Sequence, residues 1–208
     1  MQTTRTDPPY IPLRSSGWPA RRAPKWVFAA AAVLLAIGVA IGLAHHPTAG
    51  QRATDLHTFL HELTTDVQSC SGGVRESLYV LRQIDRGASH DMTTATSVAR
   101  TAAANCSPAN NQLLEDLTTV QPTESLASYH LGRAVTALID WAAPRAGQVA
   151  ADVVTVLASR GQPGEAAARA ALAADQRKLD RQRTVVDRAL APAIRAIDPA
   201  AKPPVLYG

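Results

Sequence analysis

Hydrophobic residues recur every three to four positions between residues 51 and 86, the spacing that places side chains on one face of an α-helix. They fall in two heptad rows. One row holds Leu60, Val67, Val74 and Leu81, and the other holds Leu56, Leu63, Cys70, Ser77 and Ile84. We expect a long amphipathic helix that ends near Arg86 and Gly87, because glycine after a basic last turn commonly stops a helix.

A thinner, alanine-rich stripe follows, and Asp91 is the expected N-terminal cap of this second helix. Ser107 and Pro108 have the pattern of an N-cap followed by proline at the first helical position. The second helix should therefore break after Cys106 and resume as far as about Val120.

A third helix is expected from Leu126 to Val156, after a turn in which Thr123 is a plausible cap. Proline lacks the N–H that a helix interior needs, so Pro144, together with Gly147, should bend this helix.

The last apolar stripe lies beyond a glycine- and proline-containing turn at 160–165. Its residues are Leu172, Leu179, Val186, Leu190 and Ile197. Four long helices joined by short turns predict an all-α domain over 51–198, an antiparallel up-down-up-down four-helix bundle. Prolines 199, 203 and 204 then end regular structure and make 199–208 a Pro-rich C-terminal tail.

The two cysteines support this layout. In an antiparallel hairpin, residues equidistant from the turn lie side by side, and Cys70 and Cys106 are each 18 residues from position 88. Both also fall on apolar stripes, so we expect one disulfide between the first two helices. A disulfide that closes a loop of about 36 residues contributes roughly 2 to 4 kcal/mol to the free energy of unfolding.

Residues 26–44 form a run of 19 uncharged residues, about the length that crosses roughly 30 Å of hydrocarbon as a helix. Basic residues gather before it, in a tail over 1–25, and none follows until Arg52. The positive-inside rule predicts a single-pass anchor in the cell membrane, with a cytoplasmic N-terminus, a linker over 45–50 and an extracytoplasmic C-terminal domain.

A cleaved signal peptide is the alternative to an anchor, since small residues end the apolar run at 42–44. The run is longer than a typical signal core, which favours the anchor. Within it, Gly38 and Gly42 are spaced as in helix pairs that approach closely, so self-association in the bilayer is one hypothesis. Chance spacing in an alanine- and glycine-rich helix is the favoured explanation.

The net charge of +4 belongs to the N-terminal tail, because residues 45–208 carry 16 basic and 16 acidic side chains. A neutral domain lacks the positive surface that phosphate binding requires, so we expect no nucleic-acid partner. The alanine- and arginine-rich composition is typical of a high-GC bacterial gene.

Three groups of side chains are candidates for chemistry. His57 and His61 are spaced as metal ligands on one helix face, with Glu115 and His130 roughly level. Ordinary surface histidines are the preferred explanation, because both fall outside the two core rows. Asp175, Gln182 and Ser77 interrupt apolar stripes, either as a hydrogen-bonded layer that fixes register or as the lining of a ligand pocket. The basic residues of the last helix form either a solvated, salt-bridged face or a docking site: Arg169, Arg177, Lys178, Arg181, Arg183, Arg188 and Arg195.

The sequence contains no nucleophile elbow, phosphate-binding loop, zinc-protease motif or Cys-x-x-Cys motif. We therefore expect no enzymatic activity, no cofactor and no metal. In architecture alone, and with no shared motif, the layout is similar to the helical sensory ectodomains of bacterial receptors.

The expected function is a membrane-anchored, extracytoplasmic interaction or accessory module of a bacterial cell envelope, whose partners are the lipid bilayer and either another protein or a second copy. The alternative is a small-molecule-binding, sensor-like module that acts through a partner protein.

Overall fold

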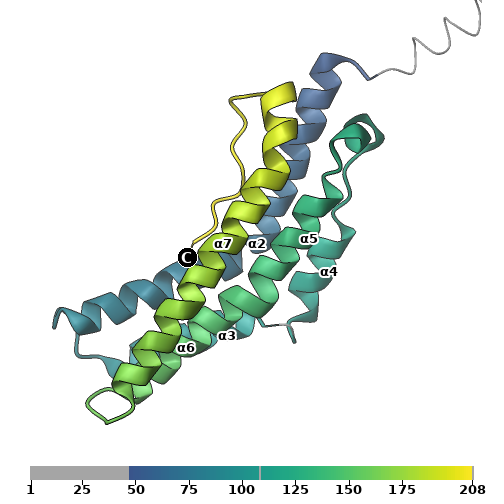
Figure 1. Ribbon diagram of the computed structural model, residues 1–208. Helices are drawn as coiled ribbons and strands as arrows, with labels where there is room; N and C mark the ends of the chain where they lie inside the picture. Colours follow the sequence, from purple (N-terminus) through teal and green to yellow (C-terminus); the bar gives the residue numbers. More distant parts are fainter. Residues whose placement is uncertain (1–46, 108, 208) are drawn as a thin grey trace, which may run out of the picture. The chain divides into compact units, whose positions relative to one another are not determined.

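The computed structural model describes residues 47–107 and 109–207, and these residues form helices and no strand. The described part is thus all-helical, as the sequence predicts. Its elements are α2 (Ala49–Asp85), α3 (Met92–Asn105), α4 (Asn111–Thr119), η1 (Glu124–Tyr129), α5 (Gly132–Trp141), η2 (Ala142–Ala146), α6 (Gly147–Ala158) and α7 (Glu165–Ile197) (Figure 1).

The predicted anchor at 26–44, with Gly38 and Gly42, lies outside the described residues. Among the helices over 47–207 that the structure does describe, none is long and apolar enough to span a bilayer.

The first helix ends where expected, but it begins at Ala49, within the linker predicted over 45–50. The Thr48 side chain accepts a hydrogen bond from the Gln51 N–H at 3.1 Å, which begins α2. The chain leaves α2 at Gly87, whose φ of 68° is the left-handed conformation that glycine adopts without a steric penalty. Asp91 then caps α3 by accepting from the Thr94 N–H at 2.9 Å, as predicted.

The break after Cys106 is confirmed, but the predicted cap is wrong. The structure begins α4 at Asn111, with Asn110 rather than Ser107 as its N-cap. The Asn110 side chain donates to the carbonyl of Asn105 at 2.8 Å and accepts from the Leu113 N–H at 3.4 Å. An asparagine that ties the end of one helix to the start of the next is a better cap than the serine three positions earlier.

The third predicted helix is divided. Residues 124–129 form the 3-10 turn η1, and His130 follows it with φ 52°, so α5 begins only at Gly132. Thr123 makes no capping bond there; its hydroxyl instead donates to Asp55 of α2 at 3.1 Å. At the position of the expected bend, Ala142–Ala146 form the π-helical turn η2. The missing proline N–H explains why the ordinary helical ladder widens at this position.

The disulfide between Cys70 and Cys106 is confirmed, with a Cα–Cα distance of 5.0 Å. Helices approach closely around it because the neighbouring residues are small. A Cβ placed on Gly73 would lie 3.0 Å from the Ala102 Cβ, and one on Gly147 would lie 2.7 Å from the Cys106 carbonyl oxygen. Larger residues at these glycines would push α3 away from α2 and α6.

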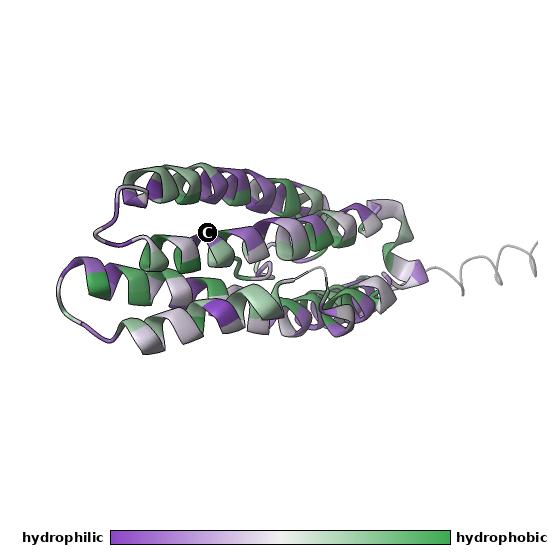
Figure 2. Cartoon of the chain, turned by 90° about the horizontal axis from the view of Figure 1, so that it is seen from below, coloured by the Kyte–Doolittle hydropathy of each residue, from purple (hydrophilic) through white to green (hydrophobic). Residues whose placement is uncertain are grey.

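The core runs between the helices, and Trp141 at its centre is fully buried. Hydrophilic and hydrophobic residues alternate around the helices, as expected when one face of each helix is buried (Figure 2). The predicted stripe of α7 supplies its buried residues Leu172, Leu179, Val186 and Leu190.

The residues after α7 are not helical, but they pack against α2 (Figure 1). The Ser71 hydroxyl donates to the Val205 carbonyl at 2.9 Å and accepts from the Tyr207 N–H at 3.2 Å. Leu206 between them is 5% exposed, and the Arg75 guanidinium lies 5.0 Å from the centre of the Tyr207 ring. The C-terminal segment is therefore a strap on the domain surface.

Candidate functional site

The predicted metal-ligand set is not assembled in the structure. The His57 Nε2 lies 2.8 Å from an Asp198 carboxylate oxygen, so this histidine links α2 to the residue that follows α7. Across 47–107 and 109–207, no three His, Cys, Asp or Glu side chains converge in a way that could hold a metal ion.

Of the polar residues that interrupt apolar stripes, two donate a hydrogen bond to a backbone carbonyl. The buried Ser77 hydroxyl donates to the Gly73 carbonyl of its own helix at 2.8 Å. The Gln182 amide donates to the Ala137 carbonyl at 3.1 Å and so ties α7 to α5. Asp175, in contrast, lines a pocket, which is described below.

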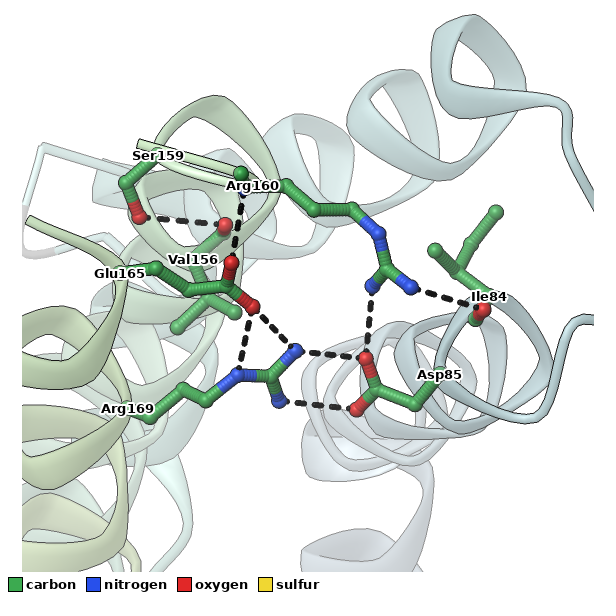
Figure 3. A network of polar contacts seen from close by, with 8 residues as sticks. Ile84, Asp85, Val156, Ser159, Arg160, Glu165 and Arg169 are labelled. Carbon is green, nitrogen blue, oxygen red and sulfur yellow. Dashed lines mark hydrogen bonds and ion pairs between the residues drawn. The ribbon is translucent and has the colours of Figure 1, made fainter. Parts of the chain in front are cut away.

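At the end of α2 that is farther from Thr48, a network of charges joins three segments (Figure 3). The Asp85 carboxylate accepts from Arg169 of α7 through both oxygens, at 2.9 and 2.6 Å, and from Arg160 at 2.7 Å. Glu165 accepts from Arg169 at 2.9 Å and from the Gly161 N–H at 2.7 Å. These contacts fix the turn between α6 and α7 against the end of α2.

The two arginines also set the protonation of Asp85. The hydrogen bond from Arg169, followed by the one from Arg160, lowers the pKa of the Asp85 carboxyl below its ordinary value of 3.8, against the opposing effect of partial burial. Asp85 therefore stays ionised into acidic solution, and the network persists there.

A hollow of about 590 Å³ adjoins this network, and we call it the tip hollow. Its walls come from the end of α2, the α2–α3 loop, the start of α3 and the end of α6. Its lining residues are Ile84, Asp85, Arg86, Gly87, Ser89, His90, Met92, Leu157 and Arg160. Ile84 and Leu157 are buried apolar residues, whereas Arg86 and His90 are exposed. An apolar floor with a polar rim is the usual anatomy of a protein-binding surface.

A second, more polar pocket of about 270 Å³ lies where η2 meets α7, and we call it the π-turn pocket. Its lining residues are Pro144, Arg145, Gln148, Asp175 and Lys178. Behind them, Asp152 of α6 is only 8% exposed and accepts a hydrogen bond from the Gln148 amide at 2.8 Å. A π-helical turn frequently marks a functional position, because the inserted residue redirects side chains.

The two carboxyl groups at this pocket differ in acidity. Burial, and then the neighbouring Asp175 carboxylate, raise the pKa of Asp152. The hydrogen bond from Lys178 lowers the pKa of Asp175. Where carboxyl groups share a site, one holds a proton more readily than the other, and here that one is Asp152.

Two buried atoms at the π-turn pocket lack a hydrogen-bond partner among the described residues: the Arg145 Nε and the Asp152 Oδ2. Unpaired buried polar atoms are costly and folded proteins contain only a few, so each of them calls for an explanation. The sequence pointed to Asp175 and to Pro144, but it gave no sign that Arg145 would line a pocket together with them.

The helices and the disulfide define the described part of the chain as a small all-helical, disulfide-linked domain. No family model, no curated protein and no solved structure matches this chain.

Proposed function

We propose that this chain is a membrane-anchored, extracytoplasmic interaction or accessory module of a bacterial cell envelope, without enzymatic activity. Residues 26–44 are the anchor and 1–25 the cytoplasmic tail in this proposal. The uncharged run and the basic residues before it support the orientation. The Cys70–Cys106 disulfide agrees with it, because disulfides persist in oxidising compartments.

The outer domain in this proposal is an antiparallel four-helix bundle. Its first helix is α2, its second is α3 with α4, its third is α5 with η2 and α6, and its fourth is α7. Packing of α2 against α3 and α6, and of α7 against α5 and α6, supports this arrangement.

The tip hollow is the observation that carries the interaction role. Helix α2 has 37 residues and is therefore roughly 55 Å long, and the tip hollow lies at its C-terminal end. The hollow fits a protein segment that inserts an apolar side chain over Ile84 and Leu157. The same segment would present a carboxylate to Arg86, because neither Asp85 nor Glu165 forms an ion pair with that arginine.

Photo-crosslinking in intact cells tests the role. A photoreactive amino acid replaces Ser89, which lines the tip hollow, or Ser128, a matched serine in η1 at the other end of α2. We expect an adduct of defined mass from position 89 only, and loss of that adduct in an Arg86→Glu variant. Equal crosslinking from both positions, or none from position 89, would contradict a docking role for the hollow.

The alternative function, a small-molecule-binding module that acts through a partner protein, is favoured by one observation. That observation is the pair of unpaired buried polar atoms at the π-turn pocket. A metabolite screen by thermal shift separates the two functions, since a module that only docks a protein should not respond to small molecules.

A further inference from the structure

The π-turn pocket combines a cavity, an unpaired guanidinium nitrogen and an excess of positive charge. Its lining carries Arg145 and Lys178 against the single carboxylate of Asp175. Lys178 is bonded to Asp175, and these two charges offset each other. Arg145 remains as the charge that no ion pair within the described residues neutralises.

Asp152 is not among the residues that line the pocket, and burial together with the neighbouring Asp175 carboxylate raises its pKa. The groups that face Asp152 are Gln148 from its own helix, and Asp175 and Lys178 from α7. The lining itself thus carries two cations against one carboxylate, which favours an anionic ligand.

We propose that the π-turn pocket binds a small carboxylate, whose oxygens accept hydrogen bonds from the Arg145 guanidinium and the Lys178 ammonium. The planar fork of a guanidinium matches a carboxylate, and an ammonium group has three donors, so Lys178 can contact both Asp175 and a ligand. A volume of about 270 Å³ suits a molecule of a few carbon atoms. The site gives the alternative function its ligand class, and it does not depend on docking at the tip hollow.

Ligand-observed saturation-transfer NMR tests the proposal with full-length protein in lipid nanodiscs. The probe is propionate, and propionamide is its uncharged control. We expect saturation transfer to propionate and not to propionamide. We expect it to be lost in Arg145→Gln and kept in Arg133→Gln, a matched change of an exposed arginine in α5.

A variant that binds propionate more tightly shows that the pocket binds the ligand, because misfolding would only weaken binding. Asp175→Asn releases Lys178 and removes the carboxylate that competes with the ligand, so we expect propionate to bind several-fold more tightly. Weaker or unchanged binding in Asp175→Asn would overturn the proposal, as would persistent binding in Arg145→Gln or no binding to the wild-type protein. Each of these results leaves the crosslinking test at Ser89 unaffected, so the two proposals fail separately.

Discussion

Replacement of Asp152 by asparagine should stabilise the protein at neutral pH. The ionised Asp152 faces Asp175 with no donor on its Oδ2, and burial disfavours its charge. An asparagine keeps the acceptor for the Gln148 amide and adds an N–H that can donate to the Asp175 carboxylate. A hydrogen bond to a charged group contributes about 1.5–3 kcal/mol to the free energy of unfolding. Because Asp175 is already paired with Lys178, we expect the variant's free energy of unfolding to rise by only about 1–2 kcal/mol.

The gain should depend on pH in a defined direction. Because the folded-state pKa of Asp152 is raised, its contribution to stability is complete below the ordinary value of 3.8 and is lost as pH rises through the folded-state pKa. The asparagine variant does not titrate. The difference in stability between variant and wild type should therefore be small at pH 3.5 and should grow towards pH 7.

Thermal unfolding followed by circular dichroism at both pH values measures this difference. For a protein of this size, 1 kcal/mol corresponds to about 2–4 °C in Tm. Asp140→Asn, at an exposed position of α5, is the matched control and should change Tm little at either pH. A lower Tm for Asp152→Asn at pH 7, or the same rise in Tm at both pH values, would show that the charge of Asp152 does not destabilise the fold.

Three further changes test other parts of the fold. Asp85→Asn should lower the free energy of unfolding at pH 7 by about 1 kcal/mol, since partly exposed ion pairs contribute little individually. In urea titrations this loss should begin to shrink below pH 3.8, where the carboxyl of the unfolded chain protonates, and should disappear once pH falls below the lowered folded-state pKa. Cys106→Ser should cost about 2–4 kcal/mol, and a reductant that lowers the wild-type Tm should leave this variant unchanged. Leu206→Ala should cost about 2–3 kcal/mol in the same urea titrations if the C-terminal strap is part of the folded core, whereas a loss under 0.5 kcal/mol would show that the strap packs only loosely.

Long periodic segments were predictable from the sequence. The heptad rows of α2 and the stripe of α7 each bury one continuous face, so local pattern and tertiary packing agree. The disulfide was predictable for the same reason, because equal distances from a turn fix which residues of a helical hairpin are neighbours.

Features that depend on several segments were not predictable. The third helix is interrupted at His130 by a positive φ that single-sequence propensity does not indicate, and at Pro144 a π-helical turn replaces a simple bend. Asp85, Arg160 and Arg169 meet only because three segments end at one place. Relative rotation and register of helices decide such contacts, and periodicity alone does not specify them.

We propose that the helical domain lies outside the cytoplasm on a membrane anchor, and cysteine accessibility in intact cells tests this topology. The native cysteines are paired in the disulfide, so a single added cysteine is the reactive thiol. A membrane-impermeant maleimide should label a Ser128→Cys variant in intact cells and a Ser16→Cys variant only after the membrane is permeabilised. Labelling of position 128 only after permeabilisation would show that the helical domain lies inside the cytoplasm and would contradict the proposed topology.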